Sequence, residues 1–341
     1  MSDTLDKTTK SDDANPVSLN DTPLSIVSER VRREIEAHTA TIYNDGFRWH
    51  LGASKIGDEC KRALWYGFRW AAQGKKDGRQ MRLFNRGHLE EKRHSEWLRG
   101  LGFTVWTHDE SQTKPDGTHP QLRIKNKCSG HLGGSLDGIV AFPSAYGIAG
   151  FAILESKTSG TGAGFNSLEA KGLAKAKPAH YIQNSIYGAD YDIQHVLYIC
   201  ANKNDDDLYI EVAKLDFNLA EQMEVKAHSI IFSQEPPAKI SENPTFFQCK
   251  SLCDFKDVCH HGKPAVKNCR SCVNCSAVDN AEFFCSVHNG IIPRDFARLG
   301  CEQWLDITAT VGTQQSITKP KNTTKVVQDT EYEIESGLDF K

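Results

Sequence analysis

The sequence has 341 residues, of which 39% are hydrophobic, so it is long enough and apolar enough to bury a sizeable core. The formal net charge of −3 excludes a global excess of positive charge, and any affinity for nucleic acid must come from a local basic surface. We expect neither a secretory signal nor a membrane span, because the sequence has no apolar signal core and no run of about 18 apolar residues.

Both ends of the sequence are polar, and we expect disordered tails over residues 1–20 and 310–341. The folded part is expected to begin near Pro23, because proline is favoured in the first turn of a helix. Apolar residues then recur at helical spacing, at Leu24, Val27, Val31 and Ile35.

Further helices and strands are predicted downstream. A helix is expected over residues 81–101, and Gly102 ends it. Short apolar stretches bounded by turn-forming residues predict strands over residues 103–106, 136–142, 151–154, 196–201 and 208–212. Another helix is expected over residues 179–191, after a Gly-, Lys- and Ala-rich segment. These elements predict the α/β class, with a central mixed sheet flanked by helices.

Three charged residues lie on or next to two of the predicted strands. Asp137 precedes an apolar run, and Glu155 and Lys157 end the returning strand. Side chains two apart on a strand share a face, so Glu155 and Lys157 point the same way while Ser156 points away. Two carboxylates can hold Mg²⁺ against a scissile phosphate, and a neighbouring lysine can neutralise developing charge. The alternative is a turn cap at Asp137 and a solvated ion pair at a sheet edge.

The flanking helices carry further polar residues in an informative order. An Arg-Gly pair and Glu91 lie on the helix before the strands. Gln183 and Tyr187 lie four apart, and hence on one face, of the helix after them. The order RG-x3-E, Asp-Gly, Glu-x-Lys and Gln-x3-Tyr resembles the RecB-like branch of the PD-(D/E)XK nucleases, over about residues 52–259. The resemblance implies a restriction-endonuclease-like core.

The resemblance also implies roles for individual residues. The expected catalytic residues are Asp137, Glu155, Lys157, Glu91, Gln183 and Tyr187. Among them, Glu91 is expected to support the metal site, and Gln183 and Tyr187 are expected to face the DNA. His88 is expected either to bind Mg²⁺ or Mn²⁺ directly, together with Asp137 and Glu155, or to be a packed helix histidine.

The sequence segments GASKIGDECKRALWYGFRW, RLFNRGHLEEKRH and CDFKDVCH most resemble phage and prophage exonucleases of recombination modules. By that resemblance we expect a Mg²⁺- or Mn²⁺-dependent DNA exonuclease that acts on linear duplex or single-stranded ends and makes single-stranded ends for recombination. A single-strand annealing or recombination protein is the candidate partner. The expected compartment is the cytoplasm, that of a bacterial host if the chain is phage-encoded. A structure-specific or CRISPR-type endonuclease and a catalytically silent metal-bound DNA-binding adaptor are the alternatives.

Four cysteines bracket the predicted core. Cys60 stands near its start, and Cys249, Cys253 and Cys259 follow its end. In a reducing compartment such cysteines favour metal ligation over disulfides. RecB-like nucleases of the CRISPR-associated and AddB types resemble this layout, which implies a [4Fe-4S] cluster held by four thiolates. Three residues separate Cys249 from Cys253 where the family pattern has two, and zinc in the same site is the alternative.

A second cysteine group predicts a zinc module over residues 263–309, after a nuclease domain over residues 21–262. Its Cys-x2-Cys pair, with another cysteine about twelve residues later, has the spacing of a zinc site. The expected ligands are Cys269, Cys272, Cys285 and Cys301, with His288 as the alternative fourth ligand. Cys275 crowds the first pair and is the least favoured ligand, and Cys128 and Cys200 are expected to be ordinary core or strand residues.

Aromatic and basic residues alternate close to Cys60, at Lys61, Arg62, Trp65, Tyr66, Arg69 and Trp70. In one interpretation they stack on bases and contact phosphates. In the other they form a helix with a buried aromatic face and a solvated charged face.

Overall fold

The computed structural model describes residues 23–42, 46–74, 76–124, 127–162 and 164–309. The tails predicted over residues 1–20 and 310–341 lie outside the described residues. Within the described ranges, no helix combines the length and the apolar character needed to cross a membrane.

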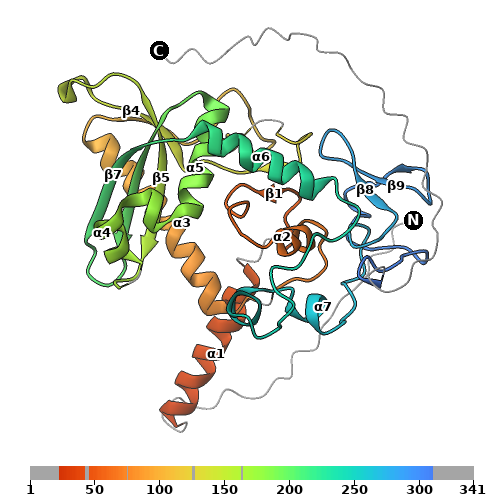
Figure 1. Cartoon of the computed structure of the whole chain (residues 1–341). Coiled ribbons are helices and arrows are strands. Elements are labelled where there is room, and N and C mark those ends of the chain that lie inside the picture. Colours follow the sequence, from red (N-terminus) through yellow and green to blue (C-terminus); the bar gives the residue numbers. More distant parts are fainter. Residues whose placement is uncertain (1–22, 43–45, 75, 125–126, 163, 310–341) are drawn as a thin grey trace, which may run out of the picture.

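A five-stranded sheet is the main sheet of the fold (Figure 1). Its strands, in the order in which they lie side by side, are β2 (Thr104–Trp106), β4 (Gly138–Ala141), β5 (Phe151–Ser159), β6 (His195–Asn202) and β7 (Leu208–Lys214). β5 and β6 run parallel, and the other neighbouring pairs are antiparallel. The predicted strands and the mixed character of the sheet are therefore confirmed.

The parallel pairing of β5 with β6 requires a crossover, because a tight hairpin joins only antiparallel strands. Two helices form it, α4 (Phe165–Ala176) and α5 (Pro178–Tyr191). α5 confirms the helix predicted over residues 179–191. It has Pro178 in its first turn, where the missing N–H costs no helical hydrogen bond. α4 lies in the Gly-, Lys- and Ala-rich segment, where the pattern predicts no helix.

Helices cover both faces of the sheet. The remaining helices are α1 (Leu24–Ile42), α2 (Lys61–Phe68), α3 (Gly78–Gly100), α6 (Phe217–Ile231) and the short α7 (Lys256–His260). On one face, Leu98 of α3 packs with Val140. The neighbouring strand residue, Ile139, faces the other core, which includes Ile186 of α5. The alternation follows from the period of two along a strand and fixes which side chains reach each face.

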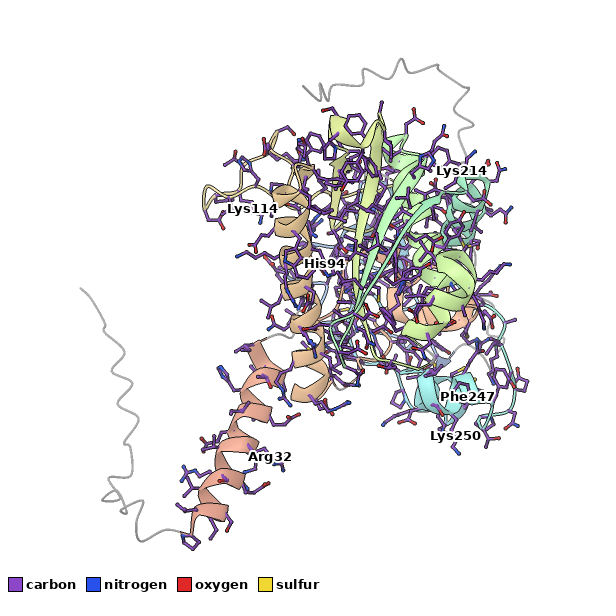
Figure 2. The ribbon with its side chains drawn as sticks, turned by 90° about the vertical axis from the view of Figure 1, so that its left-hand side faces the viewer. Arg32, His94, Lys114, Lys214, Phe247 and Lys250 are labelled. Carbon is purple, nitrogen blue, oxygen red and sulfur yellow. The ribbon has the colours of Figure 1, made fainter. Side chains whose placement is uncertain are left out.

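α3 confirms the helix predicted over residues 81–101 and begins a few residues earlier. Asp77 and Gln80 form a capping box, each side chain bonding the other residue's backbone N–H. α1 begins as predicted and crosses α3 near Gly78. Its other end projects from the body of the molecule, as the position of Arg32 in Figure 2 shows.

The C-terminal described segment forms small elements that pack on the same core. They are the π-helical turn Gln248–Leu252 and the strands β8 (Cys275–Ala277), β9 (Phe283–Cys285) and β10 (Gly290–Ile291), which form a three-stranded sheet. A further strand pair, β1 (Leu51–Gly52) and β3 (Leu132–Gly133), and the 3-10 turn Ser144–Tyr146 complete the fold.

Arg270 anchors this segment in the N-terminal half of the chain. Its guanidinium is fully buried and lies 4.3–4.4 Å from the ring centroids of Phe68, Trp70 and Phe283. It donates hydrogen bonds to the carbonyl oxygens of Phe68 and Trp49. Residues predicted as a separate module therefore share one hydrophobic core with residues predicted as the nuclease domain.

The aromatic and basic stripe near Cys60 is part of that core. Trp65, Tyr66, Arg69 and Trp70 are all buried, so they cannot stack on the bases of a bound nucleic acid. Arg69 donates to the carbonyl oxygen of Cys272. For these four residues the interpretation as DNA contacts is wrong. The packed aromatic face is confirmed for Trp65, Tyr66 and Trp70, whereas Arg69 was expected on the solvated charged face and is buried instead.

Candidate active site

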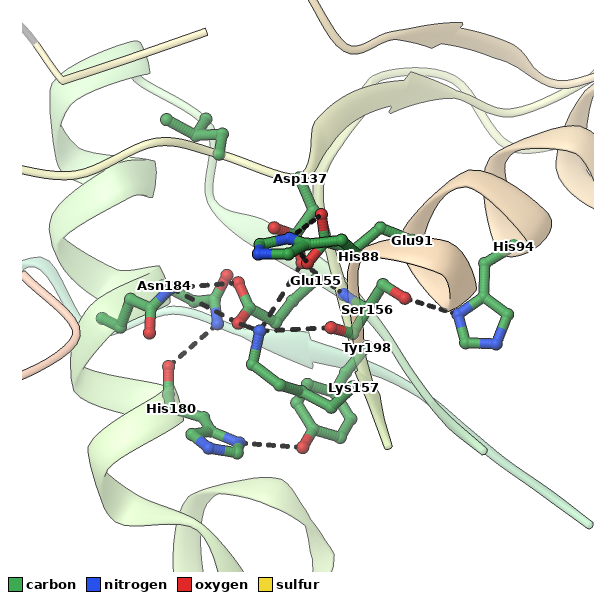
Figure 3. A network of polar contacts seen from close by, with 12 residues as sticks. His88, Glu91, His94, Asp137, Glu155, Ser156, Lys157, His180, Asn184 and Tyr198 are labelled. Atoms are coloured by element: carbon green, nitrogen blue, oxygen red, sulfur yellow. Dashed lines mark hydrogen bonds and ion pairs between the residues drawn. The ribbon is translucent and has the colours of Figure 1, made fainter. Parts of the chain in front are cut away.

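β5 places Glu155 and Lys157 on one face, where their side chains form an ion pair. Ser156, between them, faces the opposite side of the sheet, and its Oγ lies 2.6 Å from Nδ1 of His94 on α3 (Figure 3). The side chains therefore alternate as the geometry of a strand requires. The ion pair is not solvated at a sheet edge, because the Glu155 side chain has no exposed surface.

Asp137 directly precedes β4, whose antiparallel pairing with β5 places Gly138 opposite Leu154. This register places the Asp137 carboxylate next to the ion pair of Glu155 and Lys157. Its Oδ2 accepts a hydrogen bond of 2.9 Å from the backbone N–H of Ser156 and lies 3.5 Å from Nζ of Lys157. The three residues predicted to form the catalytic centre are thus brought together by two neighbouring strands.

Burial dominates the electrostatics of this group. Burial raises the pKa of Glu155, and the Lys157 ammonium limits that rise. Burial also raises the pKa of Asp137, with Lys157 opposing and Glu91 adding to the effect. Burial lowers the pKa of Lys157, but the two carboxylates outweigh it, and the pKa lies above its ordinary value. The site therefore holds a permanent ammonium beside two carboxyl groups that bind protons more tightly than in water.

α5 contributes Gln183 and Tyr187 to the same place. Nε2 of Gln183 lies 3.3 Å and 3.4 Å from the two carboxylate oxygens of Glu155, and 3.3 Å from Oη of Tyr187. Gly134 permits this approach, because a Cβ at that position would lie only 2.6 Å from Oη of Tyr187. Both α5 residues face the carboxylates, as their four-residue spacing predicts.

α3 brings Glu91 and His88 to the rim of the site. The charge of Glu91 acts on Asp137, and Nδ1 of His88 lies 3.3 Å from Oε1 of Glu91. The His88 side chain is 74% exposed, so it is not a packed helix histidine. Whether it binds a metal ion stays a prediction.

The site contains further polar residues that do not belong to any of the sequence motifs. Asn184 is fully buried, donates to the carbonyl oxygen of His180, and lowers the pKa of Glu155. His180 in turn lies 2.9 Å from the hydroxyl of Tyr198, beside Lys157 (Figure 3). The one available signal is the i, i+4 spacing of His180 and Asn184 next to Gln183, which places polar residues on an otherwise core-facing helix surface.

The donor set suits a hard divalent cation. Asp137, Glu155 and Glu91 carry carboxylate oxygens, which Mg²⁺ and Mn²⁺ prefer as ligands. The Lys157 ammonium, which contacts two of these carboxylates, shows that the place attracts positive charge. In the part of the chain that the structure describes, no three His, Cys, Asp or Glu side chains form a group that could hold a metal ion as they stand. The metal site therefore stays a prediction.

The cysteines predicted to share an iron-sulfur cluster border a single cavity. Its lining includes Cys60, Cys249, Cys253 and Cys259, although Cys60 is far from the others in sequence. Burial raises the pKa of the Cys253 thiol, and the other three thiols act on it in the same direction. The thiol donors suit soft metals. Occupancy by a [4Fe-4S] cluster or by zinc stays a prediction.

The cysteines predicted to bind zinc also approach one another. Burial raises the pKa of the Cys269 thiol, and Cys301, Cys285 and Cys272 add to the effect, in that order. Cys275, the least favoured ligand, is buried on β8 beside the guanidinium groups of Arg69 and Arg270. Zinc binding by this group stays a prediction.

No family model matches the sequence, and no curated protein matches it significantly. Among solved structures, the fold is similar to LHK-Exo, an alkaline exonuclease from Laribacter hongkongensis, also solved in complex with dAMP. The complex is 14% identical with a TM-score of 0.36, covering 58% of this chain and 90% of that chain. SSO0001 is 15% identical with a TM-score of 0.36, covering 69% and 96%. Similarity at this level carries no inference about activity.

Proposed function

We propose that the chain is a metal-dependent nuclease of the PD-(D/E)XK class. The observation that carries the proposal is the convergence of Asp137, directly before β4, with Glu155 and Lys157 on one face of β5, and the contact of Gln183 of α5 with the Glu155 carboxylate. Burial supports it as well. A buried pair of carboxyl groups costs folding free energy, and such perturbed groups gather at functional sites.

Within that class, we propose a DNA exonuclease that uses Mg²⁺ or Mn²⁺ and produces single-stranded ends. The sequence resemblance to phage and prophage recombination exonucleases supports this narrower function. A divalent ion held by Asp137 and Glu155, with Glu91 and the exposed His88 beside them, would supply Lewis-acid activation of the scissile phosphodiester.

The chain's own residues have distinct tasks in this proposal. Lys157 places an ammonium where negative charge develops on the phosphate. Gln183 holds both oxygens of Glu155 and so fixes the orientation of the carboxylate. The backbone N–H of Ser156 does the same for Asp137. Because these contacts exist before substrate binds, the groups need little reorganisation during the reaction.

The test is cleavage of labelled linear duplex and closed circular DNA with Mg²⁺, Mn²⁺ or a chelator. We expect the linear DNA to be degraded from its ends and the circle to survive. Asp137→Ala, Glu155→Ala and Lys157→Ala should each abolish cleavage while DNA binding in Ca²⁺ persists. Glu221→Ala, which removes an exposed carboxylate on α6, is the matched control and should cleave normally. Near-normal cleavage by any of the three site variants would refute the assignment.

We also propose that Cys60, Cys249, Cys253 and Cys259 hold a [4Fe-4S] cluster that joins the two ends of the core. Their shared cavity supports this proposal. Protein purified without oxygen should be brown, contain iron and lose both properties in Cys60→Ser, while Cys128→Ser should keep them. Colourless protein with zinc and no iron would reject the cluster and favour zinc in the same site.

A separate proposal concerns zinc at Cys269, Cys272, Cys285 and Cys301. The approach of three of these thiols to Cys269 supports it. Metal analysis should find about one zinc per chain at this site, and Cys269→Ser should release it. His288→Ala should retain the zinc if Cys301 is the fourth ligand. Wild-type protein without zinc would contradict the proposal.

A further inference from the structure

Ser156 contacts the proposed nuclease site through its backbone. Its N–H donates to Oδ2 of Asp137 at 2.9 Å, and its carbonyl oxygen accepts from Nζ of Lys157 at 3.1 Å. Its side chain faces the opposite side of the sheet, where Oγ lies 2.6 Å from Nδ1 of His94 (Figure 3). One residue therefore connects α3 to two of the proposed catalytic side chains.

Around Ser156, β5 is paired with a neighbouring strand on one side only in the described part of the chain. The pairing of β5 with β4 ends where Gly138 lies opposite Leu154. On the other side, β6 pairs with β5 as far as Ser159. Beyond Leu154, the backbone on the β4 side has no ladder partner among the strands that the structure describes. The N–H of Ser156 therefore bonds to the Asp137 carboxylate instead of to a neighbouring strand. The orientation of this N–H depends on how firmly the rest of Ser156 is held in place.

His94 is placed to hold it. The imidazole is fully buried, and its ring centroid lies 5.4 Å from that of Trp97. Its Nε2 lies 3.8 Å from Oε2 of Glu90, too far for a hydrogen bond, and has no hydrogen-bond partner in the described chain. A buried ring nitrogen without a partner is unfavourable. If position 94 served packing alone, an apolar residue would be favoured over histidine. The contact between Nδ1 of His94 and Ser156 therefore indicates a second role for the imidazole.

We propose that His94 and Ser156 are positioning residues of the nuclease site. The contact between imidazole and hydroxyl fixes the peptide groups on both sides of Ser156, and these direct an N–H to Asp137 and a carbonyl oxygen to Lys157. The inference rests on the proposed nuclease function. It adds to the site two residues that act from the face of the sheet opposite the carboxylates.

Three variants separate positioning from packing. Ser156→Ala and His94→Leu remove the contact. His94→Asn places an amide near the position of Nδ1 and can still bond to Ser156. We expect kcat to fall about tenfold or more in the first two variants, since small misplacements are costly in rate. KM for DNA should not change, and the Mg²⁺ concentration for half-maximal rate should rise.

His94→Asn should recover most of the rate although its smaller side chain leaves a cavity and lowers the melting temperature. Ser95→Ala, at a buried position of α3 outside this contact, is the control and should keep wild-type kcat. Rates that simply follow melting temperature, with His94→Asn as slow as His94→Leu, would overturn the proposal. Wild-type kcat in folded Ser156→Ala would overturn it too.

Failure of the nuclease proposal would be recognised separately. If wild-type protein cleaves no DNA with Mg²⁺ or Mn²⁺, the nuclease function fails, and positioning of Asp137 is then judged by Mn²⁺ affinity in calorimetry. A weaker affinity in Ser156→Ala than in Ser95→Ala would support positioning. Equal affinities in these two variants would overturn it.

Discussion

Glu155 combines complete burial with an ionisable carboxyl group, and this residue sets the expected pH dependence of the site. Burial raises its pKa from 4.5 to about 7, against the opposing effect of Lys157. The folded protein then holds the Glu155 proton more tightly than the unfolded chain does. Without metal, the stability from this group is present below about pH 4.5 and is lost as the pH rises to about 7.

The prediction is a fall in the melting temperature of chelator-treated protein between about pH 5 and about pH 7 that is smaller in Glu155→Gln, which retains only the contribution of Asp137. Metal binding requires the ionised carboxylate, so Mn²⁺ affinity should rise over the same interval. Both quantities follow from melting curves recorded with chelator and with Mn²⁺. Parallel curves for wild type and Glu155→Gln would contradict the prediction.

Single residues differ in how well the sequence predicts their roles. Glu155 and Lys157 could be assigned to one face because a strand has a fixed period of two. His94 and Asn184 could not, because a polar residue within a helix is more often solvated, and only the three-dimensional packing shows that both are buried. The partner of Ser156 belongs to another element, which no local pattern can identify.

At the scale of elements, the approach of α5 to the segment before β4 depends on Gly134. Its backbone lies so close to Tyr187 that a Cβ would meet Oη at 2.6 Å and the ring carbons Cε1 and Cζ at 2.7 Å and 3.0 Å. Tyr187 is buried and cannot withdraw easily. A larger residue at position 134 must therefore displace α5 or the loop that leads to Asp137.

We expect Gly134→Ala to reduce cleavage at least about tenfold, because a shift of about 1 Å at a catalytic group is costly in rate. Gly100→Ala is the matched control, since a Cβ there meets open space. Steady-state cleavage rates and melting temperatures of both variants check the prediction. Wild-type activity in folded Gly134→Ala would show that the close approach is not needed.

Element boundaries followed the sequence closely where the pattern was strong. Short apolar stretches bounded by turn-forming residues predicted the five strands, and Pro178 marked the start of α5. α4 was less predictable, because Gly172 adopts a positive φ inside it and divides the segment into two short helical pieces. Apolar spacing over so short a stretch does not distinguish a helix from a loop.

At the scale of the whole molecule, Arg270 connects the C-terminal described segment to the N-terminal half of the chain. We expect Arg270→Met to lower the free energy of unfolding by about 3 kcal/mol or more, because it removes donors to two carbonyl oxygens and contacts with several rings. Arg294→Met is the control, since Arg294 is exposed and lies over the ring of Trp49. Urea denaturation measures both. Equal stabilities would show that the guanidinium contributes little.

The packing of residues 263–309 onto the core could not be predicted from composition. Arginine is almost never fully buried unless it is paired, so a sequence pattern assigns Arg270 to the surface. The cysteine spacing predicts a small unit that metal holds together, and such units are often separate. In this fold, the side chains of the segment instead complete an aromatic core that begins with Trp49 and Phe68.

The contact between Arg270 and Phe68 also bears on how the chain is made. These residues are 202 positions apart, and a ribosome that adds about 5–20 residues per second needs roughly ten to forty seconds to produce the second after the first. During that time Phe68 and Trp70 lack the partner that completes their surroundings. We therefore expect this part of the core to close late in synthesis and to fold slowly, because its contacts are distant in sequence. A chaperone that covers aromatic surface would act on this chain during that interval.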